Sequence, residues 1–128
     1  MRLLLDTHLL LWSVASSRKL PSDARALLID PRNTVLFSAA SIWEVAIKST
    51  LGRPDFRVDV ARLLEAAADT GFIELPVTSA HAARVTTLPD LHKDPFDRLL
   101  VAQALVESAL LLTNDAPLGQ YSKQVRVF

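Results

Sequence analysis

Four acidic residues of this chain have the types and positions needed to hold a metal ion: Asp6, Glu44, Asp97 and Asp115. Asp6 ends the apolar run Leu3-Leu4-Leu5, which is typical of a strand buried on both faces of a parallel sheet. Such a strand does not need a carboxylate at its end, and open α/β sheets bind their ligands at the carboxyl ends of their strands. Asp6 is therefore the first candidate for a functional residue.

The other three acids occupy equivalent places beside the other predicted strands. Glu44 lies in the first turns of a helix that follows strand 34–37, and Asp97 lies in the first turn of the helix before strand 110–113. Asp115 follows strand 110–113, where it could alternatively cap a final turn. Because the carboxyl ends of parallel strands meet at one edge of the sheet, we expect all four acids to line one cleft.

Four carboxylates in one cleft, with no paired cation evident in the sequence, indicate a metal ion. Like charges a few ångströms apart raise one another's pKa and destabilise the fold unless a positive group lies between them. Ligands that are all oxygens suit Mg²⁺ or Mn²⁺ better than zinc. An ion held this way can bind a phosphate, activate a water molecule and stabilise the leaving oxygen of an in-line displacement.

Each acid also has a purely structural interpretation. Glu44 stands three residues after Ser41, which is the spacing of a capping box, and four before Lys48, which is the spacing of a helical ion pair. Asp97 would interact with the positive end of its helix, for which Asp94 is the predicted cap. These roles explain the acids one at a time, but not their convergence on one edge.

The alternation of strand and helix patterns predicts an α/β fold with a mostly parallel sheet of four to five strands and helices on both faces. The predicted strands are 3–5, 34–37, 72–75 and 110–113, with a short fifth at an edge, 125–128. The predicted helices are 7–15, 20–29, 38–52, 58–69, 79–86 and 96–107. The intervening loops are 16–19, 53–55 and 89–93. At 128 residues, the chain is expected to form a single domain, 1–128.

Composition limits the class of protein. Half of the residues are hydrophobic and none is cysteine, which predicts a globular chain without disulfides or thiolate metal sites. The leucine runs are too short to cross a bilayer and do not resemble a signal peptide, so we expect a cytoplasmic protein that does not bind membranes. The net charge is zero, so no general basic surface indicates nucleic acid binding.

A basic rim around the predicted cleft remains compatible with this neutral charge. Without the four acids, ten acidic side chains remain against 14 basic ones. Because Arg98 is adjacent to Asp97, it is the preferred member of such a rim. The candidates for the rim are Lys48, Arg53, His92, Lys93 and Arg98.

The three histidines have different expected surroundings. His8 could face either solvent or the cleft, and His92 could contact phosphate when it is protonated. His81 is predicted to lie in a short helix away from every acid, and we assign it no function. The order of these residues does not indicate a Ser-His-Asp triad, so a covalent nucleophile is not predicted.

The predicted first helix carries more apolar side chains than one core-facing stripe requires. Leucines 9–11, Trp12 and Val14 occupy most of its faces. We expect part of this surface, including Trp12, to contact a protein partner or a second copy of the chain.

Four blocks of the sequence closely resemble the PIN-domain ribonucleases, and the nearest branch is the VapC-type toxins of bacterial toxin–antitoxin pairs. The likeness covers essentially the whole chain, and the third block is the most specific. The blocks are Leu4–His8, Ser41–Lys48, His92–Ala104 and Leu112–Asp115. The resemblance implies a three-layer α/β/α fold and Mg²⁺- or Mn²⁺-dependent endonucleolytic cleavage of RNA. It also implies a homodimer and a cognate antitoxin, through which alone the protein would contact operator DNA.

The resemblance also assigns roles to individual residues. The family's acidic quartet falls on the four acids already selected, Asp6, Glu44, Asp97 and Asp115. Asp94 matches a family position that acts as a helix cap, or as an acid behind the metal ligands. Thr113 matches a family serine or threonine whose hydroxyl could orient a carboxylate or a water molecule. Apart from the resemblance, Arg98, His92 and Lys48 are the candidates for contacts with substrate or with the metal ligands.

Three alternative functions stay open at this stage. A structure-specific DNA nuclease of the same fold would use the same acids. A phosphotransferase of the haloacid-dehalogenase type also has an aspartate after its first strand, but it requires a second one where this chain has His8. A catalytically idle PIN-like module that acts in an antitoxin–operator complex would differ only in lacking turnover.

Overall fold

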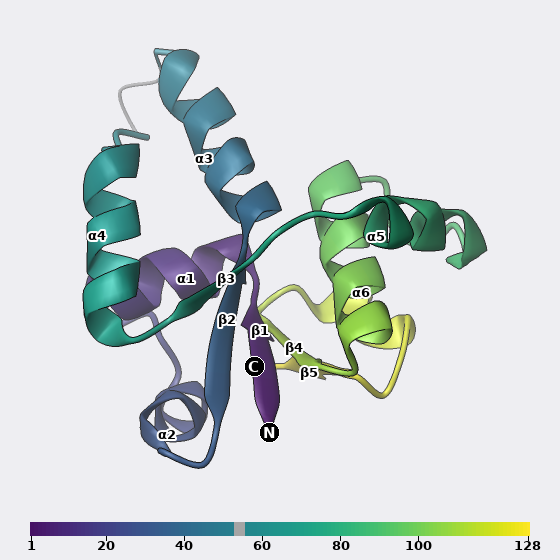
Figure 1. Ribbon diagram of the computed structural model, residues 1–128, viewed down its shortest axis with the longest axis horizontal. Helices are drawn as coiled ribbons and strands as arrows, with labels where there is room; N and C mark the ends of the chain where they lie inside the picture. The colour runs from purple at the N-terminus through teal and green to yellow at the C-terminus, as the bar shows by residue number, and fades with distance from the viewer. Residues whose placement is uncertain (53–55) are drawn as a thin grey trace.

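In the computed structural model, which describes residues 1–52 and 56–128, five parallel strands form one sheet in the order β3-β2-β1-β4-β5 (Figure 1). The strands are β1 (Arg2–Leu5), β2 (Thr34–Ser38), β3 (Ile73–Leu75), β4 (Leu110–Thr113) and β5 (Val125–Val127). The predicted parallel sheet is therefore confirmed, and β5 lies at an edge as expected. The predicted loop 53–55 lies outside the described residues.

The helices also lie close to their predicted positions. The α-helices are α1 (Thr7–Val14), α2 (Ser22–Ile29), α3 (Ala39–Thr50), α4 (Val60–Thr70), α5 (Ser79–Arg84) and α6 (Pro95–Glu107). Two short 3₁₀ helices are η1 (Val85–Thr87) and η2 (Ala116–Gln120). None of the helices in the described part of the chain is long and apolar enough to cross a membrane.

The central strand β1 is buried on both faces, and its alternating leucines separate two cores. Leu3 and Leu5 belong to the core that includes residues of α1 to α4, whereas Leu4 belongs to the core under α6. All three side chains are completely buried. Figure 1 shows α1, α2 and α4 on one side of the sheet and α5 and α6 on the other. The three-layer α/β/α arrangement is confirmed, and it explains why β1 is a continuous apolar run.

The strand register brings three chain segments to the same edge of the sheet. Leu5, the last residue of β1, pairs with Phe37 in β2 and with Leu112 in β4. The residues that follow these three strands therefore emerge side by side. The next segments of the chain are the start of α1, the start of α3 and the turn before η2.

The expectation that His81 lies away from every acid is wrong. His81 is completely buried in α5, and its Nε2 lies 2.8 Å from Glu107 Oε2 at the end of α6. Arg2 at the start of β1 contacts the same carboxylate, with 3.4 Å between Nη2 and Oε1. These partners lower the pKa of Glu107, the His81 hydrogen bond most of all. Because the partners are far apart in sequence, local patterns could not reveal this contact.

Truncation of the central strand should strongly destabilise the protein. We expect Leu4→Ala to lower the free energy of unfolding by about 2 to 5 kcal/mol, because it leaves a cavity between β1 and α6. The matched control Ile29→Ala removes a side chain that is 75% exposed and should change stability by less than about 0.5 kcal/mol. Urea unfolding of both variants measures the difference, and equal midpoints would contradict the assignment of the core.

Candidate metal centre

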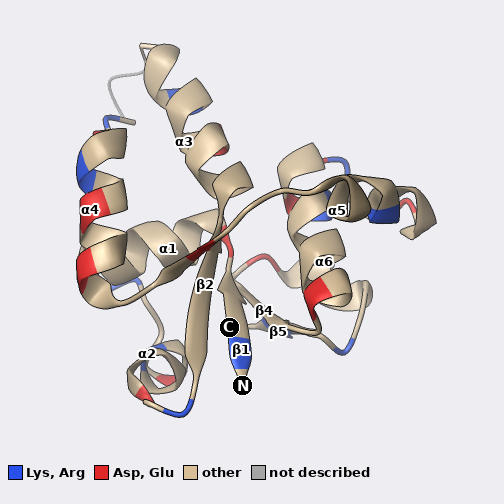
Figure 2. Ribbon diagram, in the orientation of Figure 1, with Lys and Arg blue, Asp and Glu red and all other residues tan. Residues whose placement is uncertain are grey.

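All four predicted acids line one pocket of about 390 Å³ at the carboxyl edge of the sheet. In Figure 2, acidic segments of α3, α6 and the loop after β4 surround the upper end of β1. The remaining lining residues are polar or charged: Thr7, His8, Lys48, His92, Asp94 and Asn114. The predicted convergence of the four carboxylates is therefore present in the fold.

Asp6 is the most deeply buried of the four acids and is held by hydrogen bonds on both oxygens. Its Oδ1 accepts from the Leu9 backbone N–H at 2.8 Å, so Asp6 also caps α1. Its Oδ2 accepts from Thr113 Oγ1 at 2.6 Å, which is the carboxylate-orienting contact anticipated for this threonine. Burial raises the pKa of Asp6, and these hydrogen bonds partly oppose the rise.

Thr113 connects two of the acids. While its hydroxyl donates to Asp6, the same oxygen accepts from the Asp115 backbone N–H at 3.0 Å. The carboxyl ends of β1 and β4 are thus joined through one side chain that is completely buried. This link sets the spacing between the loop that carries Asp115 and the carboxylate of Asp6.

Glu44 is fixed by two side chains. Its Oε1 accepts from Thr7 Oγ1 at 2.7 Å, and its Oε2 accepts from Lys48 Nζ at 2.7 Å. The predicted ion pair with Lys48 is confirmed, so the expectation that the acids have no paired cation is wrong for Glu44. The proposed capping box is also wrong, because α3 begins at the N-cap Ser38 rather than at Ser41. Ser41 Oγ instead lies 2.9 Å from Thr7 Oγ1.

Asp97 has a strongly raised pKa. Burial raises its pKa to about 7, and the neighbouring carboxylates of Asp94, Glu44 and Asp115 contribute to the rise. Asp94 caps α6, because its Oδ1 accepts from the backbone N–H groups of Phe96 and Asp97 at 2.8 and 3.1 Å. The predicted cap is therefore confirmed, although Asp94 also lines the pocket.

This donor set fits a hard divalent cation. The four carboxylates supply only oxygen ligands, which suit Mg²⁺ or Mn²⁺. Burial and, after it, the neighbouring carboxylates raise the pKa of Asp97, and a bound cation would favour its ionised form. Asp6, Glu44, Asp97 and Asp115 are thus the residues that could hold the ion.

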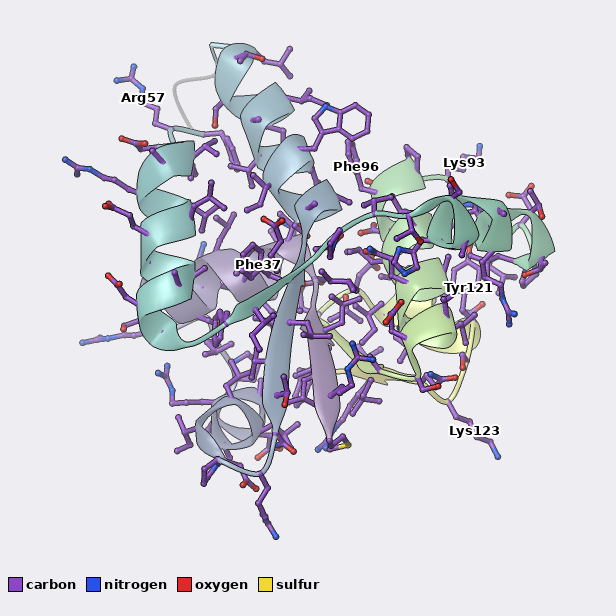
Figure 3. All side chains as sticks on the ribbon, viewed as in Figure 1. Phe37, Arg57, Lys93, Phe96, Tyr121 and Lys123 are labelled. Carbon is purple, nitrogen blue, oxygen red and sulfur yellow. The ribbon has the colours of Figure 1, made fainter. Side chains whose placement is uncertain are left out.

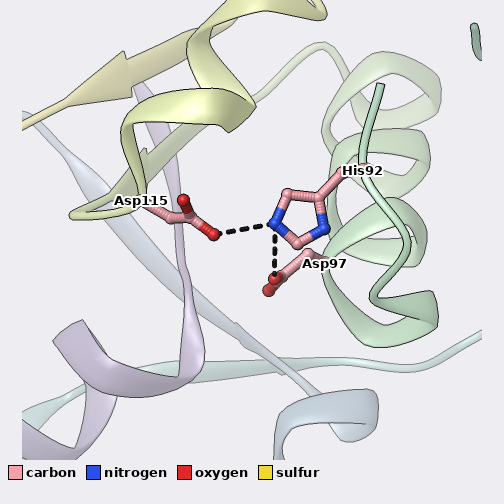
Figure 4. A group of neighbouring side chains, drawn as sticks. All are labelled: His92, Asp97 and Asp115. Carbon is pink, nitrogen blue, oxygen red and sulfur yellow. Dashed lines mark hydrogen bonds and ion pairs between the residues drawn. The ribbon is translucent and has the colours of Figure 1, made fainter. Parts of the chain in front are cut away.

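His92 lies between two of the acids (Figure 4). Its Nε2 is 3.0 Å from Asp115 Oδ2 and 3.8 Å from Asp97 Oδ2. The sequence therefore selected His92 correctly as a residue of the pocket. Its contacts are with the acids, and its predicted contact with phosphate stays a prediction.

Arg98 does not belong to the pocket, contrary to the expectation from its place beside Asp97. Its Nη1 donates to the Pro89 carbonyl at 3.0 Å and to Tyr121 Oη at 3.1 Å. Figure 3 shows Phe96 on the side of α6 that faces α3 and Tyr121 on the other side. The side chains of consecutive helical residues point about 100° apart. Arg98 therefore points away from the pocket although it is next to Asp97 in the sequence.

The predicted basic rim is therefore reduced. Lys48 and His92 line the pocket, whereas Lys93 is exposed and does not line it. Figure 3 shows Lys93 beyond the start of α6. Arg53 lies outside the described residues.

Sequence reasoning missed Thr7 and Asn114 as site residues and left His8 undecided. Thr7 follows Asp6 directly and is the first residue of α1. Its place at the carboxyl end of β1 could have identified it as a residue of the site. The Asn114 backbone hydrogen-bonds to Asp6, a contact that only the fold reveals. His8 lines the pocket but is exposed, and its ring stacks on Trp12 with 5.8 Å between the centroids.

One comparison with known proteins identifies a family. The sequence profile of the PIN domain matches residues 3–124 of the chain. No curated protein sequence matches it.

Solved structures are similar to the chain over almost its full length. One of them is the VapBC2 complex of Rickettsia felis, bound to a DNA fragment from its promoter. A chain of that complex is 13% identical to this protein with a TM-score of 0.70, and the alignment covers 100% of this protein and 98% of the Rickettsia chain. A toxin–antitoxin complex from Klebsiella pneumoniae contains a chain that is 19% identical with a TM-score of 0.65, covering 97% and 95%. A domain of a functionally unknown protein from Methanocaldococcus jannaschii is 15% identical with a TM-score of 0.58, covering 99% and 90%. At these identities, the likeness shows a shared fold.

The raised pKa of Asp97 predicts how stability depends on pH without metal. Between pH 3.8 and about 7, the folded protein keeps a proton on Asp97 that the unfolded chain releases. The contribution of Asp97 to the free energy of unfolding is therefore fully present below pH 3.8. It is lost as the pH rises from 3.8 to about 7. Asp97→Asn cannot ionise, so we expect the variant to be more stable than the wild type by about 1 to 3 kcal/mol in EDTA above pH 7.

Thermal or urea unfolding across this pH range in EDTA measures the effect. Added Mn²⁺ should stabilise the wild type and have little effect on Asp97→Asn, because a ligand stabilises only the state that binds it. Parallel stability–pH curves for the two proteins would contradict the assigned pKa.

Proposed function

This chain belongs to the PIN-domain family, and from that membership and its four converging carboxylates we propose that it is a metal-dependent endoribonuclease, the toxin of a toxin–antitoxin pair. PIN domains are nucleases. The observation that carries the proposal is the pocket in which Asp6, Glu44, Asp97 and Asp115 meet at the carboxyl edge of the sheet. Mg²⁺ or Mn²⁺ is the proposed cofactor, and the cytoplasm is the proposed location.

Asp6, Asp97 and Asp115 are the proposed ligands of the ion. A divalent ion held there would bind the scissile phosphate, lower the pKa of a water molecule and stabilise the leaving oxygen. Glu44 would help to hold the ion or orient the attacking water as a general base. Thr7 and Lys48 fix both of its oxygens, which suits a base that must keep one orientation. The proposed products carry a 5′ phosphate and a 3′ hydroxyl.

Cleavage by this pocket should require both the metal and the acids. We expect wild-type protein with Mg²⁺ or Mn²⁺ to cut RNA in a panel of tRNA, rRNA fragments, single-stranded RNA and DNA. Asp97→Asn and Asp6→Asn should lose at least about 100-fold in rate, because each loses a metal ligand. Gel analysis of the products with metal and with EDTA measures both effects.

Arg98→Gln is the matched control, because Arg98 neighbours Asp97 in sequence but lies outside the pocket. Full activity of a folded Asp6→Asn protein would contradict the mechanism. Preferred cleavage of DNA would identify the DNA nuclease. Folded, Mn²⁺-binding protein that cleaves none of these substrates would favour the idle binding module.

The antitoxin partner is supported by a second groove, of about 550 Å³, between α1 and α4. Apolar side chains including Trp12 and Leu63 line it, together with the basic Lys19, Arg57 and Arg62 and the acidic Asp59, so basic side chains outnumber acidic ones. We propose that a segment of the antitoxin binds there. Its apolar residues would contact the apolar lining of the groove, and its acidic residues would contact the basic side chains. Trp12 is only partly exposed and packs against the core, so less of it is free than the sequence predicted. Operator DNA would be contacted through the antitoxin.

The homodimer is supported by a different surface. Trp43 and Ile47 in α3 and Leu51, which caps its carboxyl end, stand four residues apart and are 62%, 37% and 59% exposed. Residues at this spacing share one helix face, so they form an apolar stripe that a second copy of the chain could cover.

We expect the free protein to sediment as a dimer. The double variant Ile47→Ser and Leu51→Ser should shift it towards the monomer, because it removes two of the stripe's three apolar side chains. The matched control Ile29→Ser changes an equally apolar exposed residue on α2 and should leave the mass unchanged. Sedimentation velocity measures all three proteins, and a clean wild-type monomer would contradict the homodimer.

A further inference from the structure

Both ring nitrogens of His92 have defined hydrogen-bond partners. Its Nδ1 lies 3.1 Å from the backbone nitrogen of Asp94, and its Nε2 lies 3.0 Å from Asp115 Oδ2. The ring is mostly buried, with 20% of the side chain exposed, so these contacts are partly shielded from water. His92 therefore sits in a fixed orientation between the start of α6 and the loop after β4.

The Asp94 contact fixes where the imidazole carries its proton. A backbone N–H can only donate, so the Nδ1 that it faces must accept with its lone pair. The neutral ring then carries its proton on Nε2. That N–H points at the carboxylate of Asp115. An ionised carboxylate has no proton to donate, so it acts only as an acceptor.

A nitrogen that carries a proton cannot also bind a metal ion. Ligation through Nε2 would require the proton to move to Nδ1, and the Asp94 backbone N–H would then face another N–H. Although His92, Asp97 and Asp115 are close enough together to surround an ion, this hydrogen bond favours the ring as a donor.

A similar arrangement is present at two of the other acids, Asp6 and Glu44. Thr113 donates to Asp6, and Thr7 and Lys48 donate to Glu44. Asp115 is the most exposed of the four side chains and follows β4 in a short loop, so a hydrogen-bond donor would restrict the positions of its carboxylate. Groups that hydrogen-bond to metal ligands commonly change metal affinity 10- to 100-fold.

We propose that His92 is a positioning residue, whose Nε2–H holds the Asp115 carboxylate towards Asp97 while the Asp94 backbone amide fixes the ring tautomer. The proposal rests on the metal site of the proposed function. It assigns to His92 an orienting role rather than that of a metal ligand.

Mn²⁺ binding, followed by the EPR signal of the free ion, tests this role without any substrate. We expect His92→Leu, which fills the space but has no donor, to weaken Mn²⁺ binding by about 10- to 100-fold. We expect His92→Gln, whose amide nitrogen can take the place of Nε2, to bind nearly as tightly as the wild type. Thermal unfolding in EDTA checks that each variant is folded.

Nitrogen spectroscopy separates an orienting histidine from a ligand. In the metal-free protein, above the ordinary pKa of histidine, ¹⁵N NMR should show His92 with a protonated Nε2 and an unprotonated Nδ1. Pulsed EPR of the Mn²⁺-loaded wild type should show no coupling between the ion and the imidazole nitrogen of His92. The spectra of the wild type and of His92→Gln should therefore show the same nitrogen couplings. A coupling to the His92 nitrogen, accompanied by equal loss of affinity in both variants, would make His92 a ligand and overturn the proposal.

The remaining outcomes distinguish this inference from the proposed function. Wild-type binding of Mn²⁺ that depends on Asp97 but is unchanged in His92→Leu would overturn only the role of His92. Absence of Mn²⁺ binding by the wild type, or equal binding by Asp97→Asn, would overturn both the metal centre and the role of His92.

Discussion

The mutual repulsion of carboxylates in a partly buried pocket is the constraint on which the rest of this structure depends. Burial, followed by the neighbouring acids, raises the pKa of Asp97 to about 7, so ionised Asp97 destabilises the metal-free fold. The surrounding side chains donate hydrogen bonds to the other three acids, Asp6, Glu44 and Asp115. Among the described residues, Asp97 has no side-chain donor within hydrogen-bond distance, and a bound cation would supply what it lacks.

The scaffold keeps these charges in place because its central strand cannot move independently. β1 is buried on both faces and pairs with β2 and β4, so Asp6 at its end is tied to two neighbouring strands. The bond from Thr113 to Asp6 joins residues 107 positions apart and connects the two ends of the sequence at the site. Asp94 fixes the first turn of α6, from which Asp97 reaches the same pocket. Each of these supports belongs to the packed scaffold, which suits a site that must hold its geometry.

Distance along the sequence from Asp97 does not predict which basic side chains contact the acids of the pocket. Arg98 is adjacent to Asp97 but contacts Pro89 and Tyr121, because consecutive helical side chains diverge. His92 is five residues before Asp97 and yet reaches both Asp97 and Asp115. The loop conformation around the Asp94 cap brings the imidazole back towards the strand ends.

The sequence by itself determined the fold class, the order of the elements and the four acids of the pocket. These follow from local patterns: leucine runs that end in Asp6, helix periods, caps such as Asp94, and the rule that parallel strands share one carboxyl edge. Only the tertiary structure decided the partners of the histidines and of Arg98, because these contacts depend on distances between residues far apart in the chain. His81 with Glu107, His92 with Asp115 and Arg98 with Tyr121 are separated by 23 to 26 positions. Local propensity carries no information on contacts at such separation, and helix packing on the sheet determines them.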